Sequence, residues 1–172
     1  GQAKIDAVAH LTMKAYEAAG QIPLSDDERT KLQADFPDVA FREGAGGKAD
    51  LLYLEHAYLR DRLNSVIGVG QWALVPRSRW GEDFEYQSKG RTVKGTIVYV
   101  EAMLLVRGCF VSEAVGDMTY YPSNAQTNYG DAVEGAKTQA LRRCCKEFGV
   151  GLQAWKKAWC EGWWQRRNDA SK

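Results

Sequence analysis

The strongest β signal in the chain is the stretch TVKGTIVYVEAMLLVRGCFVSEAVGDM, residues 92–118. Its first half is dense in β-branched and aliphatic side chains on both faces of an extended strand, a pattern typical of a central strand. Gly108 provides a turn, and residues 109–118 are a shorter β-rich partner. The stretch therefore predicts a long antiparallel hairpin whose first strand lies in the middle of a sheet.

Before this hairpin, short apolar runs alternate with turn residues. Residues 51–54 predict a short strand, and residues 55–67 predict a helix with one apolar face, closed by glycines. Residues 71–75 predict a second strand, which Pro76 ends because proline lacks a backbone donor. Residues 81–90 are polar and rich in turn formers, so we expect a loop there.

The N-terminal part of the chain predicts helices. Apolar residues recur at helical spacing over residues 5–19. Ser25 and Glu28 match a capping box at the start of a short helix that must end before Pro37. Residues 41–50 contain three glycines and predict a flexible loop.

Length and composition favour a single globular domain with an appended arm. The chain has 172 residues, of which 45% are hydrophobic and 26% charged. We therefore divide it into an N-terminal helical arm (1–50), a core domain (51–165) and a C-terminal tail (166–172). No apolar run is long enough to span a membrane, and the cysteines lack zinc-ligand spacing. We therefore expect that the protein has no membrane partner and binds no metal or cofactor. We also expect it to occupy a reducing compartment.

Charge is distributed unevenly, although the net charge is only +1. Residues 137–172 hold 9 basic and 3 acidic side chains, whereas residues 1–136 hold 14 and 19. An excess of positive charge confined to one segment is typical of a polyanion-binding surface. A solvated helix rich in Lys and Arg is the alternative interpretation.

The basic segment contains a predicted helix that Asp131 and Glu134 can cap and that ends at Gly149. Its apolar face consists of Val133, Ala136, Ala140, Leu141, Cys144 and Phe148. The opposite stripe consists of Gly135, Thr138, Gln139, Arg142 and Lys146, with Arg143 at its flank. No acidic residue lies in this stripe, and Arg142 and Lys146 place like charges one turn apart. The stripe therefore indicates phosphate binding, and its glycine leaves the helix backbone open to close approach.

Beyond this helix, an aromatic stripe repeats at helical spacing among Lys and Arg residues. It consists of Leu152, Trp155, Trp159 and Trp163. Aromatic side chains among cations are typical of a platform for single-stranded nucleic acid. The alternative, which we favour, is that the tryptophans pack against the sheet or a neighbouring subunit.

Two segments resemble the mitochondrial genome maintenance family of single-strand annealing proteins. They are RLNSVIGVGQWALVPR, residues 62–77, and ALRRCCKEFGVG, residues 140–151. More distantly, the helix, glycine turn, hairpin and basic helix resemble the eukaryotic double-strand-break repair annealing protein of the RAD group. The resemblance covers residues 51–159 and does not extend to residues 1–50.

The resemblance implies an α+β fold in which an antiparallel hairpin sheet packs on the basic helix and subunits assemble into a large ring. Single-stranded DNA would lie in a groove between hairpin and helix, with its bases exposed for pairing. The DNA-binding residues that the resemblance implies are Arg142, Arg143, Lys146 and Thr138, with Arg60 and Arg62 on the preceding helix. On the hairpin, Lys94 and Arg107, together with Lys89 and Arg91, are expected contacts for a second strand.

We therefore expect sequence-independent, ATP-independent binding and annealing of single-stranded DNA in homologous recombination and DNA repair. The expected partners are single-stranded DNA, its complementary strand and further copies of this chain. The expected location is the mitochondrial matrix, in the nucleoid, with a bacterial or phage cytoplasm as the alternative. A general DNA- or RNA-binding module for single strands, without annealing activity, is the alternative function.

An enzyme is the competing class of protein. His10 and His56 have no partners at the spacing of a catalytic triad or metal site. Cys144 and Cys145 have cationic neighbours of the kind that lower a thiol pKa, but Cys144 falls on the apolar face of its helix. We therefore expect no catalytic site.

Overall fold

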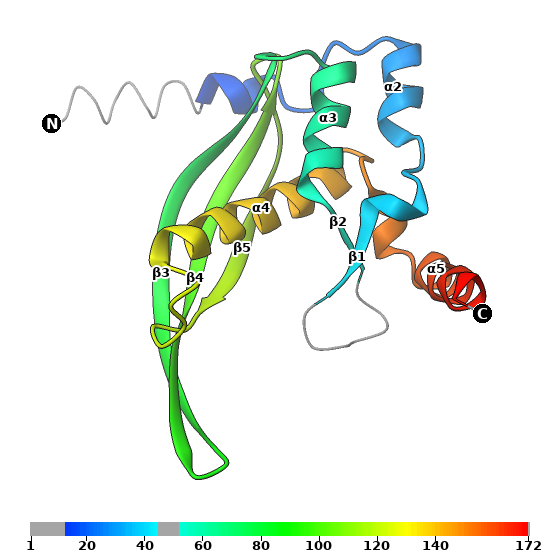
Figure 1. Cartoon of the computed structure of the whole chain (residues 1–172). Coiled ribbons are helices and arrows are strands. Elements are labelled where there is room, and N and C mark those ends of the chain that lie inside the picture. Colours follow the sequence, from blue (N-terminus) through cyan, green and yellow to red (C-terminus); the bar gives the residue numbers. More distant parts are fainter. Residues whose placement is uncertain (1–12, 45–51, 172) are drawn as a thin grey trace, which may run out of the picture.

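The computed structural model describes residues 13–44 and 52–171 (Figure 1). Within them the helices include α2 (Asp26–Gln33), α3 (His56–Val66), α4 (Tyr129–Glu147) and α5 (Lys157–Ala170), with 3₁₀ helices η1 (Asp38–Ala40) and η2 (Leu152–Trp155). The strands are β1 (Phe41–Glu43), β2 (Leu52–Leu54), β3 (Trp72–Ser88), β4 (Arg91–Val106) and β5 (Cys109–Tyr120). Strands β1 and β2 form one antiparallel sheet, and β3, β4 and β5 form another. The predicted α+β class is confirmed.

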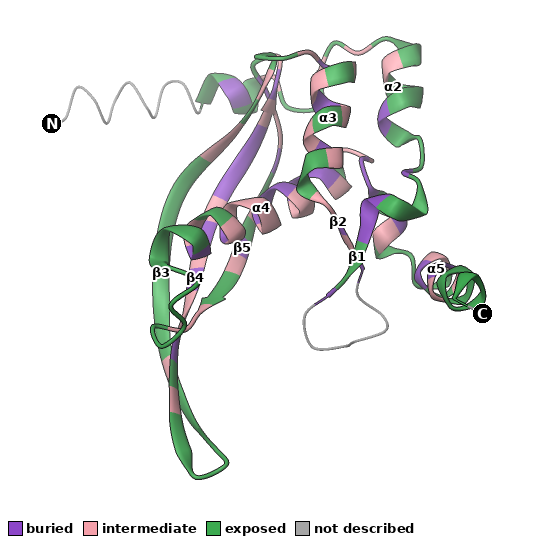
Figure 2. Cartoon of the chain, in the orientation of Figure 1, coloured by how far each residue is buried: buried purple, intermediate pink, exposed green. Residues whose placement is uncertain are grey.

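The larger sheet confirms the predicted hairpin and places β4 between β3 and β5. Both connections are two-residue turns, Lys89–Gly90 and Arg107–Gly108, in which each residue has a positive φ. This is the backbone of a type I′ turn, whose twist matches that of the paired strands. Figure 2 shows that β4 is buried near α4 and that the β3–β4 ribbon becomes exposed toward its far end.

The prediction that a strand ends at Pro76 is wrong, because β3 continues to Ser88. The loop predicted over residues 81–90 is reduced to the turn at Lys89–Gly90. A register shift between Pro76 and Ser78 accommodates the proline on an edge strand. Further along, Trp80 stacks on Tyr99 of β4 with ring centroids 5.3 Å apart. Because this part of β3 is mostly exposed, charged and polar residues separate its few aromatic side chains, and its sequence resembles that of a loop.

Helix α4 lies across β4 and β5 (Figure 1). Its Ala136 and Ala140 share a buried cluster with Val100 and Ala102 of β4. A Cβ atom at Gly116 of β5 would overlap the backbone of both helix alanines. Small residues on both elements therefore let the helix backbone contact the sheet closely.

The start and the buried face of α4 differ from the prediction. Its N-cap is Asn128, which forms a capping box with Asp131, so the helix begins at Tyr129. Cys145 is fully buried, whereas Val133 and Phe148 are only half-buried. The buried face is shifted and widened because α4 contacts the large sheet on one side and α3 on the other.

The main core joins segments that lie far apart in the sequence. Leu32 and Phe36 share one cluster with Leu63 of α3 and Trp163 of α5. Buried Gln153 of η2 completes this core, because its side-chain amide donates to the Phe36 carbonyl oxygen at 2.9 Å. Its Oε1 accepts from the Phe36 N–H at 2.7 Å. One side chain therefore satisfies both backbone polar groups of a buried residue.

The N-terminal predictions are partly covered by the described residues. The capping box of Ser25 and Glu28 is confirmed at the start of α2. The helix predicted over residues 5–19 lies partly outside the described residues, and residues 13–17 are helical. The loop predicted over residues 41–50 is wrong at its start, where strand β1 pairs with β2, and positions after Gly44 lie outside the described residues.

The C-terminal tryptophans do not share one helix, because the chain is extended at Lys156 between η2 and α5. Trp163 is buried, and Trp159 packs on Phe41 of β1 with ring centroids 4.5 Å apart. For these two residues, packing inside the protein is confirmed. Trp155 differs, since 49% of its surface is exposed.

The predicted domain boundaries stay predictions. The boundary at residue 50 lies outside the described residues, and the boundary at residue 165 falls inside α5. Among the helices described, none has the length and apolar character needed to cross a membrane.

Candidate nucleic-acid interface

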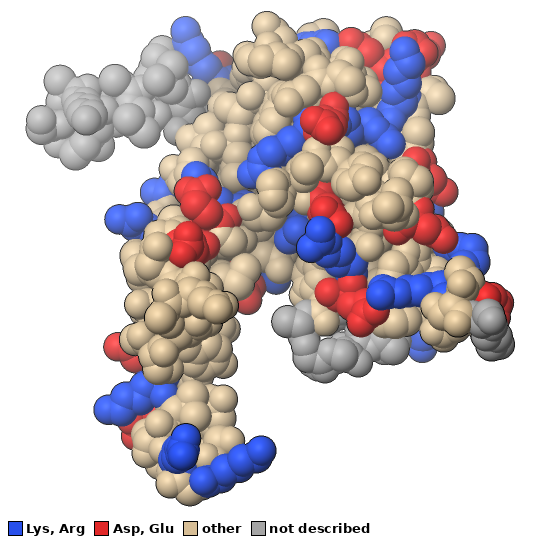
Figure 3. All heavy atoms as spheres, in the orientation of Figure 1, with Lys and Arg blue, Asp and Glu red and all other residues tan. Residues whose placement is uncertain are grey.

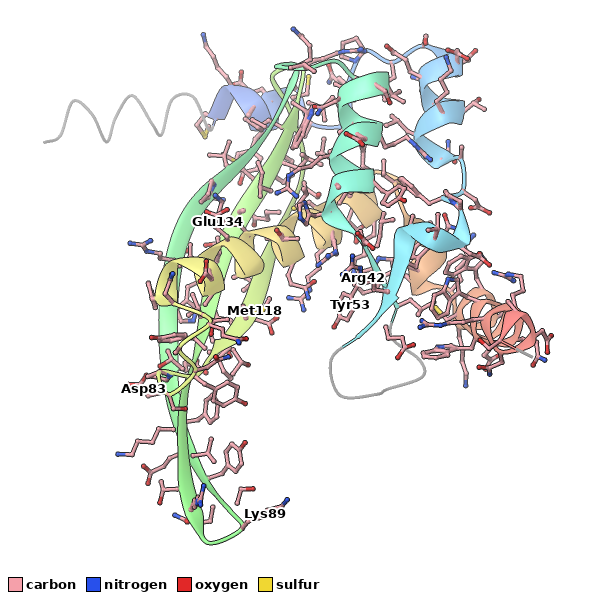
Figure 4. The ribbon with its side chains drawn as sticks, in the orientation of Figure 1. Arg42, Tyr53, Asp83, Lys89, Met118 and Glu134 are labelled. Carbon is pink, nitrogen blue, oxygen red and sulfur yellow. The ribbon has the colours of Figure 1, made fainter. Side chains whose placement is uncertain are left out.

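A surface groove of 400 Å³ lies between α3, α4 and β5. Its lining residues are His56, Arg60, Met118, Glu134, Gly135, Thr138 and Arg142. Figure 3 shows the surface receding between the projecting sheet and the part of the molecule that carries β1, β2 and α5. In Figure 4, Met118 and Glu134 lie on the β5–α4 side, and Arg42 and Tyr53 lie on the β1–β2 side. The groove therefore brings together Arg60, Thr138 and Arg142, three of the predicted DNA-binding residues.

Arg142 is held in place by β2. Its Nε donates a hydrogen bond of 2.7 Å to the carbonyl oxygen of Leu54, and its guanidinium lies 5.5 Å from the centroid of the Tyr53 ring. Burial lowers the pKa of Arg142, and the nearby charge of Arg60 lowers this pKa further. Since an arginine stays protonated at neutral pH, the groove holds a poorly solvated positive charge.

Arg60 reaches the same groove from α3. Its Nη1 atom is buried and has no hydrogen-bond partner. Within residues 13–44 and 52–171, neither Arg60 nor Arg142 forms an ion pair with an acidic side chain. Glu134 of the groove pairs instead with Lys137, at 2.9 Å between Nζ and Oε1. Two neighbouring cations that form no ion pair are suited to bind an anion.

Arg143 and Lys146 have partners within the chain. Arg143 donates to the carbonyl oxygen of Val115 and lies 3.0 Å from the Asp117 carboxylate, so its charge is partly neutralised. The Nζ of Lys146 lies 4.2 Å from the centroid of the Trp155 ring, which leaves its charge available to an anion.

The prediction that Gly135 leaves the helix backbone open is wrong. A Cβ atom at Gly135 would contact the side chain of Met118, which reaches over the helix from β5. Thr138, almost one turn further along α4, is half-buried at the groove. Met118 and Thr138 therefore form part of the groove floor.

Arg62 and Arg107 lie outside the groove and connect secondary-structure elements. Arg62 donates to backbone carbonyls at the end of α2, including that of Ala34 at 2.6 Å. Arg107 donates to both carboxylate oxygens of Glu28. Arg62 follows Arg60 by two helical positions, so the two side chains leave α3 on different faces. The structure does not bring Arg62 or Arg107 to Arg142.

The remaining predicted cations lie on the projecting β3–β4 ribbon. Lys94 is exposed on β4, with its Nζ 3.9 Å from the Glu85 carboxylate. Lys89 forms the turn at the end of the ribbon, as Figure 4 shows, and Arg91 is exposed beside it. These residues therefore form a basic end on the ribbon that is separate from the groove (Figure 3).

Two aromatic residues lie beside the groove. The sequence analysis did not single out Tyr53, and it placed Trp155 in an aromatic stripe for which packing was the favoured interpretation. Tyr53 of β2 and Trp155 of η2 line a second cavity, of 210 Å³, to which Arg142 also contributes. Tyr53 lies between buried Leu52 and Leu54, so strand alternation alone would have placed it on the outward face. No comparable local pattern distinguishes Trp155 from the packed tryptophans.

Cys144 and Cys145 are both fully buried. Burial raises the pKa of each thiol, so the cationic neighbours do not produce a reactive thiolate. In the part of the chain that the structure describes, no group of three His, Cys, Asp or Glu side chains could hold a metal ion.

Residues 12–171 match the family model for Mitochondrial genome maintenance MGM101. This chain belongs to the Mgm101 family. It is 32% identical over 143 residues to the mitochondrial genome maintenance protein MGM101 of Kluyveromyces lactis, covering 82% of this chain and 47% of that protein. It is 31% identical over 149 residues to the mgm101 homolog of Dictyostelium discoideum, covering 86% of this chain and 35% of that protein. The chain therefore spans less than half the length of these relatives.

Membership of the Mgm101 family confirms the resemblance inferred from residues 62–77 and 140–151. The match is longer than expected, because it includes most of residues 1–50 and continues to residue 171. The names of the relatives place their function in the mitochondrion, in agreement with the location expected from the sequence.

Proposed function

We propose that this chain binds single-stranded DNA along the groove and anneals complementary strands during recombination and repair of the mitochondrial genome. The observation that supports this function best is the approach of Arg60 and Arg142 without an acidic partner. A backbone phosphate would neutralise both charges and provide the acceptor that Arg60 Nη1 lacks. The genome-maintenance names of the relatives support the same substrate class.

The mechanism needs no covalent step. Cations along the groove reduce the repulsion between two polyanionic strands, and base pairing then provides the specificity. Because phosphate contacts carry no sequence information, binding is nearly independent of sequence and weakens as salt rises. Annealing by this route uses no ATP and no metal ion.

Self-assembly into a ring is part of the proposal. One chain offers only a few phosphate contacts, so high affinity requires many subunits on one strand. Large aromatic side chains are exposed on the β3–β4 ribbon, with Trp80 41% and Tyr86 47% accessible. Aromatic surface of this kind is enriched at interfaces between subunits.

Fluorescence anisotropy tests whether the groove binds the strand. It measures the affinity for a labelled single-stranded oligonucleotide at several salt concentrations. Arg60→Gln and Arg142→Gln should each weaken binding and reduce the slope of log affinity against log salt by about 1. Lys157→Gln is the matched control, because it removes one charge from the same basic segment at an exposed position outside the groove. Equal effects of all three substitutions would contradict the groove assignment.

Two further measurements test annealing and ring assembly. The rate at which two complementary fluorescent oligonucleotides anneal tests the first, and the particle mass from light scattering tests the second. We expect faster annealing by a particle many times heavier than the 19.2 kDa chain. Binding without faster annealing would leave the alternative of a general single-strand binding module. Tighter binding to RNA than to DNA at matched salt would overturn the assignment of DNA as substrate.

A further inference from the structure

The 210 Å³ cavity beside the groove is lined by residues of β2, α3, α4 and η2. Arg142 lines both the cavity and the groove, so the two are adjacent. Aliphatic side chains, including Leu54 and Ala154, cover part of the cavity wall, and Gln139 provides one amide. The cavity is therefore mostly apolar, with a cation at the side that meets the groove.

Two aromatic rings line this cavity, and each has a cation over it. The guanidinium of Arg142 lies 5.5 Å from the Tyr53 ring centroid, and the ammonium of Lys146 lies 4.2 Å from that of Trp155. Cations over aromatic faces restrain the rings and concentrate positive charge at the edge of the cavity. Trp155 nevertheless exposes 49% of its surface, which leaves ring area for a further contact.

This combination fits a flat heteroaromatic ring joined to an anion. Aromatic walls stack on any nucleobase, an amide can hydrogen-bond to its edge, and cations at the rim attract the attached phosphates. Pockets for drug-sized ligands begin at about 300 Å³, so a cavity of 210 Å³ suits one base better than several stacked bases.

We propose that this cavity binds one unstacked nucleobase of the single strand, between Tyr53 and Trp155. The proposal rests on the proposed function, because the strand that supplies the base is the one whose phosphates lie along Arg60 and Arg142. Each subunit then anchors the strand at one base and leaves the neighbouring bases free to pair. Stacking contributes affinity that does not depend on salt, in addition to the salt-dependent phosphate contacts.

An abasic oligonucleotide separates the two contributions, because it retains every phosphate and lacks every base. Affinities for a labelled thymidine oligonucleotide and for an abasic one of equal length are measured at the same salt concentration. The wild-type protein should bind the thymidine strand roughly 10-fold more tightly. Trp155→Ala and Tyr53→Ala should each lose roughly 10-fold on the thymidine strand and leave abasic binding unchanged. Tyr53→Phe keeps the aromatic ring and should bind both oligonucleotides as the wild type does.

Leu152→Ala is the matched control, since Leu152 belongs to the same 3₁₀ helix, is 42% exposed and does not line the cavity. It should bind both strands as the wild type does. Ala154→Leu retains both aromatic rings and narrows the cavity, so it should weaken binding of the thymidine strand alone. If urea denaturation shows that Trp155→Ala is unfolded under the conditions of the binding experiment, Ala154→Leu provides the test in its place.

The results distinguish this proposal from the function on which it rests. Wild-type protein that binds neither oligonucleotide would overturn the proposed function. Wild-type protein that binds both equally well would overturn only the base site. Equal losses by Trp155→Ala on both strands would also overturn the base site, because Trp155 would then act through Lys146 and the phosphates.

Discussion

Glu28 and Arg107 join helix α2 to the turn between β4 and β5. Both carboxylate oxygens of Glu28 accept hydrogen bonds from the guanidinium, at 2.7 and 3.0 Å. The same guanidinium donates to the backbone oxygens of Pro23 and Ile67. The hydrogen bonds that Glu28 accepts from Arg107, with one from the backbone N–H of Ser25, lower the pKa of Glu28 from 4.5 to about 2.

Glu28 should therefore make the stability of the protein depend on pH in the acid range. A carboxyl whose pKa is lower in the folded state stabilises the fold above its unfolded pKa, and this contribution is lost as pH falls from about 4.5 to about 2. Glu28→Gln should lower the urea concentration at which half of the protein is unfolded at pH 7. The difference in this concentration from the wild type should shrink as pH falls across that range. Asp27→Asn, which removes an exposed carboxyl from the same helix, should have a smaller effect at pH 7. A difference that stays constant down to pH 2 would contradict the prediction.

Gly116 should be required for the contact between α4 and β5. A Cβ atom there would overlap backbone atoms of Ala136 and Ala140, which cannot move aside as a flexible side chain can. Gly116→Ala should lower the free energy of unfolding by about 3 kcal/mol or more, measured by urea denaturation. The control is Gly162→Ala in α5, where a Cβ meets only the end of the Arg166 side chain. It should stay within about 1 kcal/mol of wild type.

Gln153 should contribute strongly to stability. Gln153→Leu fills similar space but leaves the N–H and carbonyl of buried Phe36 without partners. We expect a loss of about 2–4 kcal/mol in the free energy of unfolding. Gln165→Leu, at an exposed position of α5, should change it by less than about 0.5 kcal/mol. A small effect at Gln153 would show that water replaces the lost hydrogen bonds.

The cysteines should be unreactive in the folded protein. Cys109, Cys144, Cys145 and Cys160 are all buried, and burial raises the pKa of Cys144 and Cys145. Iodoacetamide at pH 8 should label these thiols slowly in native protein and rapidly in urea, as measured by mass spectrometry. Rapid labelling of Cys144 or Cys145 without urea would reopen the hypothesis of a nucleophilic cysteine.

Local sequence patterns predicted the elements that short-range rules govern. The hairpin of β4 and β5 follows from dense β-branched residues around Gly108, and the capping box at Ser25 follows from side-chain spacing. Helical periodicity placed Arg142 and Lys146 on one stripe, because residues four apart share a helix face. The same rules failed for β3, since its exposed ribbon depends on pairing with β4.

By itself, the sequence determined the family, the α+β class, the central hairpin and the cationic stripe of α4. Only the tertiary structure decided which cations meet: Arg60 joins Arg142 at the groove, whereas Arg62 turns to the end of α2. It also brought Tyr53 and Trp155 to one cavity from segments about a hundred residues apart. The physical reason is that periodicity assigns a side chain to a face of its own element. What that face contacts depends on packing between elements that are distant in the chain.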